Sequence, residues 1–225
     1  MINKVFTYIL LSILVPAIVI IGCLVFREKQ YAFVSAIVAI IACGVFFLSF
    51  EKKEHSAQRL TIIAALTAIA IVSRIIFSPL QGFKPVTAII IITAMYFGSE
   101  AGFMVGAMTA LISNFYFSQG PWTPFQMLTW GLIGLLAGIF AESLKNKKAW
   151  RLIFGALAGI LFSMLMDVYS VLWIDGNFNL PRYAFYLTSS LKFTIIFAFS
   201  NVVFLLILAD PIGKKLERIK TKYDL

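Results

Sequence analysis

Apolar residues along the chain come in long runs separated by short polar stretches. A helix that crosses a bilayer needs about 20 mostly apolar residues, and eight runs come near that length. The run at 85–99 is short for a full span, so we expect it to be tilted, kinked or joined tightly to the next helix. The eight predicted segments are 5–26, 31–50, 60–78, 85–99, 101–118, 125–144, 152–174 and 188–209.

The composition agrees with this pattern, because 61% of the 225 residues are hydrophobic and only 13% are charged. A soluble domain has roughly 45–50% apolar and about 25% charged residues. The sequence therefore predicts an all-α polytopic membrane protein.

The side on which each loop lies follows from its Lys and Arg residues, which are enriched on the cytoplasmic side. With the N-terminus inside, thirteen basic residues fall on the inner side and four on the outer side. We expect a bacterial plasma-membrane protein with both termini in the cytoplasm. The net charge of +9 fits this topology and contact with anionic lipids, so we expect no nucleic-acid partner. The inner residues are Lys4, Lys52, Lys53, Arg59, Lys145, Lys147, Lys148, Arg151, Lys214, Lys215, Arg218, Lys220 and Lys222, and the outer ones are Arg27, Lys29, Lys84 and Arg182.

Cys23 and Cys43 lie inside apolar segments, where a free cysteine behaves as a small buried hydrophobe. Neither has a Cys, His or carboxylate at ligand spacing, so we expect no disulfide, metal site or cofactor. An alternative for Cys23 is a lipidated cysteine after a degenerate signal, although its apolar run exceeds the about 7–15 residues of such signals. His55, the only histidine, falls in the charged loop 51–59, where we expect a solvated side chain.

The charged loop 51–59 also marks the boundary between two kinds of helix. The helices before it contain almost no polar residues, whereas the segments after it contain all the informative ones. We predict an N-terminal transmembrane hairpin with a basic loop at 1–56 and a six-helix substrate-binding domain at 57–212. A basic cytoplasmic tail at 213–225 follows, for which we expect a short amphipathic or frayed helix.

Several classes of membrane protein have sequence motifs that this chain lacks. It contains no GxxxxGK[ST] string for nucleotide phosphates, no HExxH motif and no helix with repeated arginines. A histidine confined to a loop also argues against a rhomboid-type serine protease. We therefore expect a chain without catalytic residues or an ATPase site, and hence not an enzyme.

Six polar residues lie within the predicted helices, where hydrocarbon makes them costly and therefore candidates for function. Five of them fall in the outer halves of five different helices, which predicts a cavity open to the outside. The alternative is that Arg74 and Lys192 extend to the outer interface while Asp167 pairs with one of them. The five are Arg74, Asn114, Gln126, Asp167 and Lys192; the sixth, Asn201, lies near the middle of its helix.

The outer loops add aromatic, amide and charged side chains around Gly and Pro, a mixture typical of a ligand pocket. Trp122, between Pro121 and Thr123, and the nearby Gln126 are the candidates to reach a ligand. An interfacial aromatic belt is the simpler interpretation for Trp173, Tyr183, Phe185 and Tyr186. The loop segments are QGFKP (81–85), FSQGPWTPFQ (117–126) and IDGNFNLPRYAFY (174–186).

Small residues recur at a spacing of four in the inner halves of the helices, which lets helix backbones approach closely. We expect packing within the bundle to explain most of these pairs, in GSEAG (98–102), GFMVG (102–106), GLLAG (134–138) and GALAG (155–159). Ala64 and Ala68 stand near the inner end of the first of the six helices, so they are candidates to pack against another subunit.

The six segments from about 57 to 210 resemble the substrate-specific (S) component of an energy-coupling factor (ECF) vitamin transporter. The most specific feature is Gly-Pro-Trp-Thr-Pro before a helix that starts Gln-Met and continues Trp-Gly-Leu-Ile-Gly. The resemblance predicts a six-helix S-component core, from which the first 50 residues depart as an extra N-terminal hairpin. It rests on the Ala64-xxx-Ala68 pair, FKPVTAIIIITAMYFGSEAGFMVGAMTALISNF (83–115) and FSQGPWTPFQMLTWGLIGLLAGI (117–139).

The resemblance implies a bilayer-embedded binding subunit of an ABC importer. An S component binds a vitamin near the outer face and docks on a transmembrane coupling (T) subunit that carries two cytosolic ATPase subunits. Ala64 and Ala68 would form part of the docking surface. The expected ligand-binding residues are Arg74, Lys84, Asn114, Gln119, Trp122, Thr123, Gln126, Trp130, Asp167 and Lys192.

The Pro-framed Trp-Thr loop and FKPVTA are most similar to family members associated with cobalamin and related corrinoids. Folate, pantothenate, riboflavin and a queuosine precursor stay open as ligands. Two other classes of function also stay open. One is a self-contained transporter driven by protons through Asp167, and the other is a membrane assembly protein whose polar cluster only locks the bundle.

Overall fold

The computed structural model describes residues 4–26, 31–50 and 56–223, and every regular element in these ranges is a helix. This confirms the predicted all-α polytopic class. Within the described ranges, three helices are long and apolar enough to cross a bilayer by themselves. The elements are α1 (Lys4–Ile9), the π-helical turn η1 (Leu10–Leu14), α2 (Val15–Phe26), α3 (Tyr31–Phe50), α4 (Ser56–Ile76), α5 (Val86–Phe97), α6 (Ser99–Phe117), α7 (Trp122–Ile139), α8 (Ala141–Asn146), α9 (Lys148–Asp175), α10 (Leu180–Ser189) and α11 (Leu191–Tyr223).

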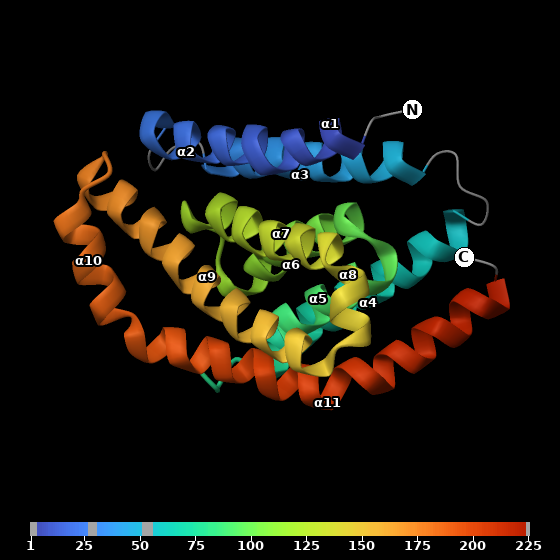
Figure 1. Cartoon of the computed structure of the whole chain (residues 1–225). Coiled ribbons are helices and arrows are strands. Elements are labelled where there is room, and N and C mark those ends of the chain that lie inside the picture. The colour runs from blue at the N-terminus through green and yellow to red at the C-terminus, as the bar shows by residue number, and fades with distance from the viewer. Residues whose placement is uncertain (1–3, 27–30, 51–55, 224–225) are drawn as a thin grey trace.

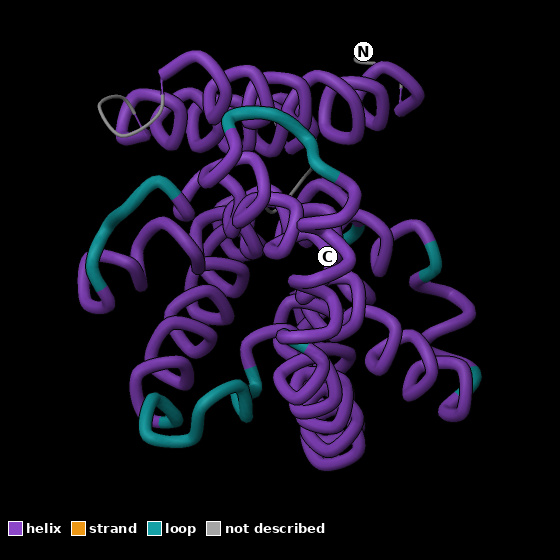
Figure 2. The backbone as a smooth tube through the Cα atoms, turned by 90° about the vertical axis from the view of Figure 1, so that its left-hand side faces the viewer, coloured by secondary structure: helices purple, strands orange, loops and turns teal. Residues whose placement is uncertain are grey.

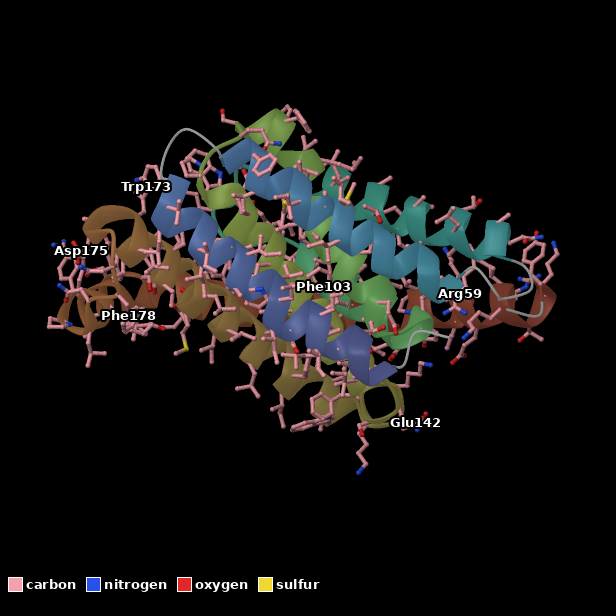
Figure 3. The ribbon with its side chains drawn as sticks, turned by 90° about the horizontal axis from the view of Figure 1, so that it is seen from above. Arg59, Phe103, Glu142, Trp173, Asp175 and Phe178 are labelled. Atoms are coloured by element: carbon pink, nitrogen blue, oxygen red, sulfur yellow. The ribbon has the colours of Figure 1, made fainter. Side chains whose placement is uncertain are left out.

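An N-terminal hairpin, formed by α1, η1 and α2 with the returning α3, covers one flank of the bundle (Figures 1 and 2). It packs on α6 and α7, and Leu11, Val15, Val19 and Val38 belong to the same buried apolar core as the bundle. Seen from above, the hairpin crosses the layer that contains Phe103 of α6 (Figure 3). The hairpin therefore shields apolar faces of α6 and α7.

Some sequence predictions concern positions outside the described residues. They include the burial of the side chains of Cys23 and Cys43, and the solvation of His55. Four of the basic residues used for the topology also lie there: Arg27, Lys29, Lys52 and Lys53.

Helix α5 lies at the centre of the bundle, and 11 of its 12 residues are buried. A helix that is apolar on all sides is typical of a position surrounded by other helices. Twelve residues rise only about 18 Å, compared with the roughly 30 Å of a hydrocarbon core. The expectation of a short segment at 85–99 is thus confirmed, and Gly98, with φ of 93°, joins α5 directly to α6.

Helices α6 and α7 form the closest helix pair in the core. A Cβ atom on Gly102 or on Gly134 would collide with the backbone of the other residue, and one on Gly106 would collide with the backbone of Trp130. Only glycine permits this approach, which confirms that the regularly spaced glycines of these two helices serve packing within the bundle.

Two elements at the C-terminal end differ from the sequence prediction. The segment 174–186, predicted as an outer loop, contains most of α10, whose first turn is capped by the Asn179 side chain accepting from the Arg182 amide. Helix α11 continues through Pro211 to Tyr223, so the predicted tail is an extension of the last helix. The extension packs through Leu216, which is 4% exposed, and Lys220 Nζ, which donates to the Tyr96 carbonyl at 3.1 Å. These contacts offset the backbone hydrogen bond that Pro211 cannot donate.

The bundle has two distinct ends (Figure 1). One end, called the outer end, carries the loops 77–85, 118–121 and 176–179. The opposite, inner end contains the beginnings of α1 and α4 and the end of α11. Asp175 and Arg59 mark these two ends in Figure 3. Of the described basic residues that were predicted to be cytoplasmic, Lys4 and Arg59 lie at the beginnings of α1 and α4, and those from Lys214 to Lys222 lie in the last turns of α11.

Candidate functional site

A cavity of about 360 Å³ lies among α4, α5, α7, α9, α11 and the loop 77–85. This volume falls within the roughly 300–1,000 Å³ of small-molecule sites. Its wall combines two cations, amide and hydroxyl groups and four aromatic rings, without a carboxylate among the described lining residues. The lining consists of Arg74, Ser78, Gln81, Gly82, Lys84, Val86, Thr87, Gln126, Trp130, Gly159, Phe162, Phe193, Phe197 and Asn201.

Arg74, in the last turn of α4, brings a positive charge into this cavity. Its Nη1 donates to Asn114 Oδ1 at 2.8 Å and to Ser113 Oγ. The guanidinium carbon lies 4.6 Å from the ring centre of Phe117 and 5.1 Å from that of Trp130. Neither ion pair seen among the described residues involves Arg74. Neutral acceptors and aromatic faces therefore hold this charge, which leaves it able to attract a ligand oxygen.

Asn114 links Arg74 to helix α7 through its amide. Its Nδ2 donates to Thr123 Oγ1 at 3.0 Å and to Gln126 Oε1 at 2.9 Å. Thr123 Oγ1 in turn donates to Gln119 Oε1 at 3.0 Å, and Gln119 Nε2 donates to the Leu111 carbonyl at 2.8 Å. Since Asn114 occupies Oε1 of Gln126, the remaining polar group of this cavity-lining residue is its NH₂ donor.

The turn that begins α7 is stabilised by its own side chains. The Thr123 amide donates to the Gly120 carbonyl at 2.9 Å, and the Gly120 amide donates to Thr123 Oγ1 at 3.3 Å. The Trp122 ring packs so closely on Gly120 that a Cβ atom there would collide with it. This accounts for the glycine in GPWTP and places Trp122 against the turn, outside the cavity lining.

The loop 77–85 carries Lys84 into the cavity and is attached to α11. The Lys84 amide donates to Ser200 Oγ at 2.8 Å, and the same hydroxyl donates to the Lys84 carbonyl at 3.1 Å. Gly82 allows the bend with φ of 80°. Burial lowers the pKa of the Lys84 ammonium, and the neighbouring charge of Arg74 lowers it further. Negative or acceptor atoms of a ligand beside Lys84 would favour the charged ammonium and so oppose both effects.

The opposite wall of the cavity is aromatic. The rings of Trp130 and Phe162 stack with centroids 5.3 Å apart, and Phe162 meets Phe197 edge to face at 5.2 Å. Trp130 Nε1 is buried and has no hydrogen-bond acceptor among the described residues. A buried indole N–H without an acceptor is costly, so a ligand carbonyl at this place would gain a hydrogen bond.

The structure divides the ten predicted binding residues into three groups. Arg74, Lys84, Gln126 and Trp130 line the cavity. Asn114, Gln119 and Thr123 stand behind the lining and join α4, α6 and α7 through hydrogen bonds. Trp122, Asp167 and Lys192 are outside the lining, and their contact with a ligand stays a prediction.

Asp167 occupies a separate polar position between α9 and the junction of α10 with α11. Its Oδ2 accepts from Ser190 Oγ at 2.6 Å, and one turn away Thr194 Oγ1 donates to Ser163 Oγ at 2.7 Å. Asp167 therefore does not pair with Arg74 or Lys192. Such a pair was the alternative to a binding site in the sequence analysis. Lys192 is exposed at the beginning of α11.

Most of the cavity wall was absent from the predicted binding set. Asn201 had been recognised as a polar helix residue but was not among the predicted binding residues. In the structure it lines the cavity, and its Nδ2 donates to the Gly155 carbonyl at 3.0 Å. Gln81, Gly82 and Lys84 belong to QGFKP (81–85), which was identified from the sequence as an outer loop with a composition typical of a ligand pocket. The rings of Phe162, Phe193 and Phe197 gave no signal, because in a membrane helix they resemble lipid-facing residues.

Two further predictions concern metals and the inner end of α4. Among the described residues, no group of three or more His, Cys, Asp and Glu side chains could hold a metal ion. Ala64 and Ala68 are both exposed on α4. Ile69, Val72 and Ile76 continue this exposed apolar face toward the outer end.

Comparison with known proteins identifies a family. The model of the family described as "ECF-type riboflavin transporter, S component" matches residues 54–218, which comprise α4 to most of α11 and leave out the hairpin. No curated protein and no solved structure gives a match.

Proposed function

Because the chain belongs to the family of ECF-type riboflavin transporter S components, we propose that it captures a vitamin in the cavity around Arg74, Gln126 and Trp130. The observation that carries the proposal is the donor-rich lining of that cavity, which holds two cations and no described carboxylate. The chain supplies binding, and the ATPases that drive uptake are separate subunits.

The first candidate ligand is riboflavin. The family description names it, and a cavity of about 360 Å³ suits a single fused ring system with a short polar chain. The ring would lie against Trp130 and Phe162, while its carbonyl oxygens would accept from Arg74, Lys84 and Trp130 Nε1. Aromatic faces with a few placed donors are the usual means of binding such a molecule.

The second candidate is cobalamin, which the resemblance of FKPVTA and the GPWTP turn favours. In the structure Lys84 and Val86 of the first motif line the cavity. A corrinoid is much larger than riboflavin, so it would require the loops 77–85 and 118–121 to move apart. This difference in loop movement separates the two candidates experimentally.

The test is calorimetric titration of the purified full chain with riboflavin, cobalamin, folate, pantothenate and a queuosine precursor. Mass spectrometry of the purified protein would identify any ligand that is carried through purification. We expect one vitamin to bind at one site, and Arg74→Gln to weaken that vitamin's binding. The proposal fails if no vitamin binds, or if Arg74→Gln binds as tightly as the unaltered chain.

We also propose that Ala64 and Ala68 dock on the coupling subunit. The support is their exposure on α4 at the inner end, together with the small side chains that let a second helix approach. Ala64→Trp should block assembly with the coupling subunit and ATPases while leaving vitamin binding intact. Ile207→Trp, on the exposed face of α11, is the matched control. Normal assembly of Ala64→Trp would contradict the docking role.

The two rival functions make different predictions. A proton-driven transporter would use Asp167, which in the structure accepts from Ser190 and does not line the cavity. An assembly protein would bind no vitamin. Vitamin uptake by the chain alone in vesicles with a proton gradient would favour the first rival over an ATP-driven subunit.

A further inference from the structure

A second recess lies at the inner end of the molecule, between the beginning of α4 and the end of α11. It has a volume of about 600 Å³ and is called the basic groove below. The two helix ends lie on the same side in Figure 1, and Arg59 marks the beginning of α4 above the last turns of α11 in Figure 3. The groove is lined by Gln58, Thr61, Ile62, Lys215, Arg218, Ile219, Lys222 and Tyr223.

The charge in the basic groove comes from one face of α11. Lys215, Arg218 and Lys222 follow one another at spacings of three and four, which places them on the same side of a helix. All three are exposed, and neither ion pair among the described residues involves them. No Asp or Glu is among the described lining residues. Three like charges held this closely attract an anion.

The rest of the lining suits a ligand that is both polar and apolar. Gln58 and Thr61 of α4 offer hydrogen-bonding groups opposite the cations. Ile62 and Ile219 supply apolar surface within the same groove. A free phosphate would use the cations but not the apolar surface.

The position of the groove indicates where such a ligand would come from. Helix α11 is apolar up to Ala209, and its basic extension begins a few residues later, at Lys214. The groove therefore lies beyond the apolar part of α11, at residues 215–223. Basic pockets between membrane helices on the cytoplasmic side bind anionic headgroups. We infer that the basic groove binds the phosphate headgroup of an anionic phospholipid, with the beginning of an acyl chain against Ile62 and Ile219.

The test uses the full chain purified in neutral detergent and native mass spectrometry with phosphatidylglycerol or phosphatidylcholine. We expect phosphatidylglycerol to be retained about tenfold more tightly. A variant with Lys215→Gln, Arg218→Gln and Lys222→Gln should lose this preference. The matched control carries Lys147→Gln, Lys148→Gln and Lys214→Gln, which removes the same charge from exposed positions outside the groove. The control should keep the preference.

Three outcomes would overturn the inference. The first is equal binding of the two lipids to the unaltered chain. The second is loss of the preference in both triple variants, which would indicate only diffuse charge attraction. Displacement of phosphatidylglycerol by millimolar inorganic phosphate would indicate a site for a free anion. A charge-preserving variant, with Lys215→Arg, Arg218→Lys and Lys222→Arg, should behave like the unaltered chain and excludes a folding defect as the cause.

Discussion

In the outer half of the bundle, α4, α7 and α11 surround a cavity, whereas nearer the inner end α6 and α7 touch backbone to backbone at Gly102 and Gly134. The outer half keeps groups without a full set of partners, such as the charge of Arg74 and the indole N–H of Trp130. The inner half has almost no spare space between these two helices. Trp130 belongs to both regions, because its backbone packs against Gly106 while the residue lines the cavity.

The largest effect should come from filling the glycine contact. Gly134→Leu places a side chain where the Gly102 backbone lies, so we expect a loss of more than about 3 kcal/mol of stability or no folded protein. Thermal unfolding in detergent measures this. Gly44→Leu is the control, because nothing lies within 4 Å of a Cβ atom there. Equal effects of the two substitutions would contradict the assignment of packing to this level.

A smaller effect is expected in the outer half, and on ligand binding rather than on folding. Arg74→Gln removes the charge that Asn114 orients, so we expect the vitamin's affinity to fall about 100-fold, or about 2.7 kcal/mol. Arg182→Gln, which only breaks the exposed pair with Asp175, is the control. Calorimetry provides both values. Unchanged affinity in Arg74→Gln would remove the cavity from the binding role.

Trp130→Phe removes the indole N–H from the same cavity. Phenylalanine keeps an aromatic face toward Phe162 but lacks the N–H that has no described acceptor. We expect a loss of affinity of about fivefold to tenfold, corresponding to about 1 kcal/mol. Trp173→Phe, outside the lining, should leave affinity unchanged. Equal affinity of the two variants would show that the indole N–H does not reach the ligand.

The last effect concerns pH and is absent below the lowered pKa of Lys84. A ligand acceptor beside Lys84 favours the protonated ammonium, so binding takes up a proton once the pH exceeds the lowered pKa of Lys84. Affinity should be constant below that pKa and fall by up to about tenfold per pH unit above it. Lys84→Gln should bind more weakly at neutral pH and lack the decline. A decline that persists in Lys84→Gln would assign the titration to another group.

The sequence was sufficient to predict the helical class, the positions of the long apolar segments and the short segment at 85–99. It also brought Arg74, Asn114 and Gln126 together correctly, because each is a polar residue near the outer end of its helix and the structure joins them by hydrogen bonds. Their cost in hydrocarbon is a property of each residue alone, so sequence can detect it.

Other features depend on contacts between distant segments, which an apolar pattern does not reveal. Phe162 and Phe197 face the cavity, yet the same residue type faces lipid elsewhere, as Phe199 does with 60% exposure. The passage of α11 through Pro211 depends on the packing of its extension against Tyr96. The sequence of helix α10, LPRYAFYLTS, lacks the long apolar run used to identify the other segments, and none of its residues is buried.

The shortness of α5 also affects the strength of the interactions at its outer end. If its inner end lies at one membrane surface, its beginning at Val86 lies about 12 Å below the other, since the helix rises about 18 Å and the hydrocarbon measures roughly 30 Å. Lys84 and the cavity then lie beneath the plane of the outer surface, in a medium of low dielectric constant. There an attraction between Arg74 and a ligand oxygen would be several times stronger than in water.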